Sequence, residues 1–228
     1  MIALPVVISI HSAYHRGMNR IFTPLAATAV LLMLIALVMG LGLRACDIRN
    51  PQDRAAQQWA TAHRLAGVGV GLVVVLINSI VVTYFIGTSR WCKEVVETYS
   101  LDRELIDRTT RLKRRTFPYA LLNMLIVVSV IALGGAADPG GAVQVNARVE
   151  RLQAAARDDM GGAQRSIEAQ APDDALWGNL HFAGASLGLC FIAYAFFIQW
   201  HQIAENHQVI EEVMAEVKRV RTERGLEG

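Results

Sequence analysis

Two histidines occupy the same place in two matching stretches of the chain. Residues 59–67 carry one at His63, and residues 177–184 carry the other at His181. Each stretch begins with a tryptophan, places its histidine four residues later, and continues into an Ala-Gly step at the start of a long apolar segment. Because an ionisable group inside a membrane is costly and usually functional, this pair is where chemistry is first expected.

The spacing within each stretch places the imidazole and a glycine on one face of a helix. At about 100° per residue, Trp59, His63 and Gly67 fall on one side, and the second stretch does the same with His181 and Gly184. In an up-down bundle of four helices, the second and fourth helices run parallel and lie diagonally across the core. We therefore expect the two imidazoles to face each other across that core, at similar depth.

Two facing imidazoles are the ligand pair that a b-type haem needs, because haem iron takes axial imidazole ligands. Gly67 and Gly184, one turn after each histidine, remove side chains that would otherwise obstruct the porphyrin. Arg64 is placed to pair with a propionate. In helix number, ligand placement and neighbouring glycine, the pattern resembles the four-helix membrane cytochromes b. The sequence thus predicts haem b with His63 and His181 as the iron ligands.

The same residues have a structural interpretation without any cofactor. Gly67 with Gly71, and Gly184 with Gly188, form small-xxx-small motifs, which are common where transmembrane helices touch. A tryptophan at the end of a span is usual at the membrane interface, and a neutral histidine can hydrogen-bond across helices. A divalent metal ion at the pair is a further alternative, with Asn179 or outer-loop carboxylates as additional ligands.

Four long segments without Asp, Glu, Lys or Arg must position this pair. Each has at least 22 residues, and a helix of about 20 apolar residues crosses the hydrocarbon core of a bilayer. Hydrophobic residues make up 53% of the chain and charged residues 18%. The sequence therefore predicts an all-α fold, a bundle of four transmembrane helices. The segments are residues 21–43, 65–89, 116–137 and 175–204.

The remaining parts of the chain are interpreted around these spans. Residues 1–20 are expected to form an N-terminal segment at the membrane interface, without a cleavable signal peptide and with Met18 as an alternative start. Residues 21–228 are expected to form a single membrane domain. This domain would include an outer-loop insertion at 138–174 and a helical cytoplasmic tail at 205–228.

The basic residues predict the orientation of the spans. The second connection, residues 90–115, holds eight of the 22 Lys and Arg residues. Because these residues accumulate on the cytoplasmic side, both termini and this connection are expected to be cytoplasmic. The protein is accordingly expected to be integral to a membrane, and a bacterial inner membrane fits best.

The chain also has the pattern of a duplicated helical hairpin. Arg20 and Pro24 open the first apolar segment much as Arg115 and Pro118 open the third. A proline near the start of a helix is well tolerated, because the N–H that it lacks would have no partner there. The matching histidine stretches then open the second and fourth segments. The pattern predicts a two-fold repeat whose axis lies along the membrane normal.

Helical periodicity continues among charged residues after the second and fourth segments, with a break predicted at Tyr99 and Ser100. It predicts cytoplasmic helical extensions whose apolar stripes pack against each other, with a docking surface for a partner as the alternative. The stripes include Val95, Val96, Leu105, Leu112, Val209, Val213 and Val217.

Other function classes lack their usual signatures. A net charge of +2 does not indicate a nucleic-acid partner, and the three cysteines lie in separate parts of the chain. The absence of acidic residues from the four segments disfavours an ion-coupled transporter, and no phosphate loop or nucleophile motif is present.

We therefore expect a one-electron transfer protein that is not an enzyme on its own. Its partners would be the lipid bilayer, a quinone or other membrane redox subunits, and further copies of the same chain. His201 is turned about 200° around the helix from His181, so a single haem is expected. The alternative function is a non-enzymatic four-helix scaffold or assembly subunit that recruits partners through its cytoplasmic helices.

Overall fold

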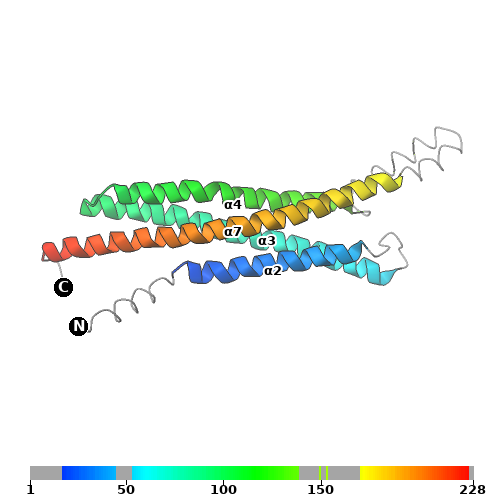
Figure 1. Ribbon diagram of the computed structural model, residues 1–228, viewed down its shortest axis with the longest axis horizontal. Coiled ribbons are helices and arrows are strands. Elements are labelled where there is room, and N and C mark those ends of the chain that lie inside the picture. The colour runs from blue at the N-terminus through cyan, green and yellow to red at the C-terminus, as the bar shows by residue number, and fades with distance from the viewer. Residues whose placement is uncertain (1–16, 45–52, 139–148, 150–152, 154–169, 226–228) are drawn as a thin grey trace. The chain divides into compact units, whose positions relative to one another are not determined.

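The computed structural model describes residues 17–44, 53–138, 149, 153 and 170–225. Four long helices make up this part of the chain, and each is long and apolar enough to cross a membrane. The prediction of an all-α protein with four such helices is therefore confirmed. The helices are α2 (Asn19–Leu43), α3 (Arg54–Tyr99), α4 (Glu104–Ala137) and α7 (Gln170–Glu223), which Figure 1 colours from blue to red along the chain.

Two predicted elements fall largely outside the described residues. Residues 1–16 of the predicted interfacial segment lie outside the described part of the chain. Residues 139–169 of the predicted outer-loop insertion also lie outside it, except for residues 149 and 153. Cys46 also lies outside the described part of the chain.

Helix α3 extends beyond its apolar segment, residues 65–89, at both ends. Polar residues on either side of that segment set where the helix begins and ends. At its start, Asp53 Oδ1 accepts a hydrogen bond from the N–H of Ala56 at 3.0 Å, which is the usual geometry of an N-cap. At its end, Ser100 has a positive φ of 56°, and the Leu101 N–H returns to the Val96 carbonyl at 2.9 Å. Such a left-handed residue closes a helix, so the break predicted at Tyr99 and Ser100 is confirmed.

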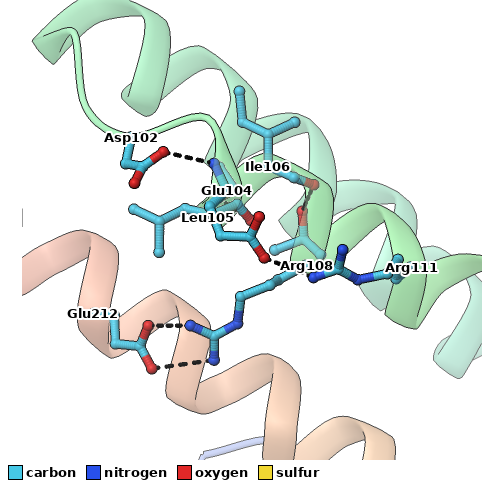
Figure 2. Close-up of polar contacts among 9 residues, drawn as sticks. Asp102, Glu104, Leu105, Ile106, Arg108, Arg111 and Glu212 are labelled. Carbon is cyan, nitrogen blue, oxygen red and sulfur yellow. Dashed lines mark hydrogen bonds and ion pairs between the residues drawn. The ribbon is translucent and has the colours of Figure 1, made fainter.

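Helix α4 begins directly after this turn, in the charged segment. Asp102 accepts a hydrogen bond from the N–H of Glu104 at 3.0 Å, as Figure 2 shows. The prediction that Pro118 lies near a helix start is wrong, because the preceding charged residues are already helical. Pro118 instead lies inside α4, where it leaves the carbonyl of Arg114 without its usual helical partner.

The chain divides into two compact units, and each takes a segment from all four helices. One unit, which we call the histidine unit, comprises the described parts of Ala29–Val74 and Met124–Phe191. The other, which we call the amide unit, comprises the described parts of Met1–Thr28, Val75–Asn123 and Ile192–Gly228.

The amide unit buries the apolar stripes that continue into the charged segments. On its surface, Arg108 of α4 binds both carboxylate oxygens of Glu212 of α7, one of them at 3.2 Å (Figure 2). These contacts agree with extensions that pack against one another. The buried stripe residues are Val96, Leu105, Leu112, Val209, Val213 and Val217.

Three fully buried amide side chains meet in the core of the amide unit. Asn78 Oδ1 accepts hydrogen bonds from Asn123 Nδ2 at 3.1 Å and from Gln199 Nε2 at 3.0 Å. All three residues are 0% exposed, and they come from α3, α4 and α7. We call this set the amide cluster. Within it, Asn123 Oδ1 and Gln199 Oε1 have no hydrogen-bond partner.

Candidate functional site

In the histidine unit, contacts between neighbouring helices form a closed ring. Apart from the histidine contact described next, these contacts link each helix, or the residue that directly follows it, to two others, so α3 and α7 are left as one of the two diagonal pairs. The contacts are Trp59 Nε1 to the Met39 carbonyl at 3.1 Å, Gly71 against Ile131, Gly188 against Ile126, and Arg44 to Asn179.

The two histidines meet across this diagonal. The ring centroids of His63 and His181 lie 6.2 Å apart, with the ring planes at 78° to each other. Both side chains are half-buried. The structure thus provides the juxtaposition of imidazoles that the haem hypothesis requires, while haem binding itself stays a prediction.

The orientation of His181 is fixed by a hydrogen bond to the backbone of α4. His181 Nδ1 lies 3.1 Å from the Val130 carbonyl oxygen. A carbonyl oxygen can only accept, so Nδ1 must carry the proton, and Nε2 of the neutral ring then carries a lone pair. Histidine ligands of metals commonly donate their other ring nitrogen to a backbone carbonyl in this way.

His63 makes the corresponding interaction less completely. Its ring interacts with the backbone of Ala36 on α2, but Nδ1 is buried without a partner in hydrogen-bond geometry. A buried polar atom without a partner costs free energy. A hydrogen bond from His63 Nδ1 to the Ala36 carbonyl would give His63 the same tautomer as His181.

Each histidine ring lies directly over a glycine of the preceding helix. A methyl group added at Gly134 would lie 2.9 Å from His181 Cε1, and one added at Gly40 would lie 3.1 Å from His63 Cε1. Any side chain at these positions would push the rings aside. We call Gly40 and Gly134 the seat glycines.

The spacing of the rings fits two ligands of one metal ion. Imidazole nitrogens bind a metal at about 2 Å, so two opposite ligand nitrogens lie about 4 Å apart, and the ring centroids lie further back on each side. The observed 6.2 Å between centroids is of that size. In the described part of the chain, this place included, no group of three or more His, Cys, Asp or Glu side chains is placed to hold a metal ion.

The glycines chosen from sequence have different surroundings. A methyl group at Gly67 would meet no heavy atom within 4 Å, whereas one at Gly184 would lie 3.2 Å from Leu133 Cδ1. Gly184 and Gly188 therefore lie against α4, as the small-xxx-small interpretation predicts. Clearance for a porphyrin at Gly67 and Gly184 stays a prediction.

Arg64, chosen as the partner of a propionate, is paired with a carboxylate of the chain. Its guanidinium lies 2.5 Å from Asp138 Oδ2 and 3.3 Å from the hydroxyl of Thr61. A second arginine, Arg44, binds Asn179 and lies beside the neighbouring residues of α7. Sequence reasoning named Arg64 and did not name Arg44.

The seat glycines were also missed, although the sequence carries a signal for them. Gly40 follows Pro24 by the same number of residues as Gly134 follows Pro118. The backbone groups beside the two rings, at Ala36 and Val130, also follow these prolines by equal numbers of residues.

Comparison of the chain with known protein families, with curated proteins and with solved structures found no match.

Proposed function

We propose that the histidine unit binds one b-type haem between His63 and His181 and that the protein transfers single electrons. The observation that carries this proposal is the pair of imidazoles in contact across a diagonal of the bundle, 6.2 Å apart. Two further contacts support it. Each ring lies against a glycine of the preceding helix, and the hydrogen bond to the Val130 carbonyl orients the ring of His181.

The donor set favours haem over a bare divalent ion. Two imidazoles are a complete axial set for a cofactor that brings its other ligands with it, as a porphyrin does. A structural or catalytic zinc ion usually takes three or four protein ligands, and only these two come together at this place among the described residues. When bound, haem would supply a one-electron redox couple.

The residues around the cofactor have distinct parts in this proposal. Val130 holds the proton of the His181 ring on Nδ1 and keeps Nε2 free to bind iron. Gly40 and Gly134 leave room for the rings beside α2 and α4. The apolar helix segments around the half-buried rings would limit the access of water to a bound haem and would tune its redox potential.

We further propose that the unit arose from a duplicated hairpin. The repeat of Trp59 and His63 at Trp177 and His181 supports this, and so does the shared register of the seat glycines. Duplication would explain why each half provides one equivalent ligand.

In this proposal the protein is integral to a bacterial inner membrane, with both termini and the helical extensions in the cytoplasm. The basic residues of the second connection support that orientation. The haem would then lie near the outer face. Its electron partners would be a quinone or other membrane redox subunits, and the chain could act as a homo-oligomer.

An absorption spectrum of the detergent-purified protein tests the haem. Expressed with haem available, the wild type is expected to show sharp bands on reduction. His63→Ala and His181→Ala should each remove those bands. His201→Ala is the matched control, because that exposed ring packs edge-to-face against Phe197 and Trp200 of its own helix. Folded wild-type protein without haem absorbance contradicts the proposal and favours a scaffold function.

A further inference from the structure

Two arginines in the histidine unit differ in the charge of their partners. Arg64 forms an ion pair with Asp138 at 2.5 Å, so the two charges compensate each other. Arg44 hydrogen-bonds to the side-chain oxygen of Asn179 and lies over the ring of Phe182, 5.0 Å from its centroid. Both of these partners are uncharged, so the positive charge of Arg44 is not balanced by them.

Each arginine belongs to, or contacts, a helix turn that carries one of the proposed ligands. Arg64 follows His63 directly in the chain, and Phe182 follows His181. Arg44 is therefore held against the turn of α7 that also carries one of the proposed ligands. The exposed position of Arg44 leaves its guanidinium accessible to a group arriving with the cofactor.

We propose that Arg44 binds a carboxylate of the cofactor and that the site therefore selects an anionic porphyrin. This inference rests on the proposed haem function. A guanidinium binds a carboxylate through two parallel hydrogen bonds, which are stronger than its bond to a neutral amide. The carboxylate would replace the amide oxygen of Asn179 while the Phe182 ring keeps the guanidinium in place.

The charges also predict the orientation of the porphyrin. On the side of α3 and α4, Arg64 already has the carboxylate of Asp138. On the side of α2 and α7, Arg44 has only uncharged partners among the contacts described above. The carboxylate edge of the porphyrin is accordingly placed toward Arg44, which gives one orientation in a site whose two halves are otherwise alike.

Haem b and its dimethyl ester, in which both carboxylates are neutral, provide the test. The purified haem-free chain is titrated with each, and the ratio of the two dissociation constants is measured. An exposed ion pair contributes up to about 1 kcal/mol, so the wild type is expected to bind haem b about fivefold more tightly than the ester. Arg44→Gln should abolish that preference, and Arg44→Lys should keep part of it.

Arg54→Gln is the control for removal of a positive charge, since Arg54 is exposed at the start of α3 and contacts neither histidine. Its preference for haem b should equal that of the wild type. The ratio of affinities does not depend on overall stability, so a merely structural effect of Arg44→Gln would weaken both titrations equally.

The outcomes separate the two proposals. If the wild type binds both porphyrins equally, or if Arg64→Gln loses the preference while Arg44→Gln keeps it, the role of Arg44 is overturned and the haem site stands. If the chain binds neither porphyrin, the haem function itself fails, and the role of Arg44 fails with it.

Discussion

The amide cluster and the histidine pair are both polar groups in the interior of a helix bundle, yet they direct their hydrogen bonds differently. Asn78 accepts from Asn123 and Gln199, so these side chains bind one another. His181 donates to the backbone carbonyl of Val130 instead, which leaves the other ring nitrogen with a lone pair. The first arrangement joins three helices, and the second presents a ligand atom.

This difference predicts that the amide cluster determines stability and that the histidine pair determines haem affinity. Variants of the amide cluster should change the stability of the protein and leave haem affinity unchanged. Variants around the histidines should change haem affinity and leave the stability of the haem-free protein nearly unchanged. The predictions below test that separation.

The largest effect on haem affinity is expected at a seat glycine. Gly134→Val should weaken haem binding by at least about tenfold, because its Cβ would lie 2.9 Å from His181 Cε1 and would displace the ring. Titration of the haem-free protein with haem measures this. Gly69→Val is the matched control, since a methyl group at Gly69 would meet nothing within 4 Å. Equal affinity of the two variants would contradict the seating of the ring.

The largest effect on stability is expected at Asn78, the hub of the amide cluster, which accepts both of its hydrogen bonds. Asn78→Leu removes the acceptor of two buried N–H groups, and each unpaired group costs about 1–2 kcal/mol. We expect the free energy of unfolding to fall by about 2–3 kcal/mol, measured by denaturation in mixed detergent micelles. Haem affinity should stay within about twofold of the wild type. A large loss of haem binding in this variant would contradict the prediction that the amide cluster affects stability alone.

The sequence was sufficient for the four spans and for the pairing of the histidines. Uncharged length identifies a helix that can cross a membrane, and matched spacing placed His63 and His181 on facing sides. Both signals lie within single segments, where the helical period relates residue number to direction.

Contacts between helices were not predictable in the same way. Gly40 and Gly134 touch the histidines from neighbouring helices, and nothing in the spacing of one segment identifies what an adjacent helix brings to it. For the same reason, the meeting of Asn78, Asn123 and Gln199 from three helices was not predicted. The continuity of α4 from Glu104 through Pro118 was not predicted, because hydrophobicity marks the apolar part of a helix and not its ends.

A smaller loss of stability is expected at the edge of the amide cluster. Gln199→Leu removes one donor to Asn78 and also removes Gln199 Oε1, which is buried without a partner. The two effects oppose each other, so the free energy of unfolding should fall by less than about 1 kcal/mol. The same denaturation experiment compares this variant with Asn78→Leu. A larger loss for Gln199→Leu would contradict the role of Asn78 as the hub.

The smallest effect is expected at the surface ion pair of the amide unit. Arg108→Gln breaks its contact with Glu212, and an exposed pair of this kind contributes about 0.5 kcal/mol. The loss should shrink in high salt, because mobile ions screen charges at the surface. Thermal denaturation at low and high salt measures both. A loss that is large and independent of salt would show that the pair holds the two helices together.

The spin state of bound haem tests the central claim most directly. Electron paramagnetic resonance of the oxidised wild type is expected to show one low-spin haem per chain, as two axial imidazoles impose. His63→Ala and His181→Ala should each lose that signal. A haem that stays low-spin in the absence of both histidines, or a folded chain that takes up no haem, would contradict the account.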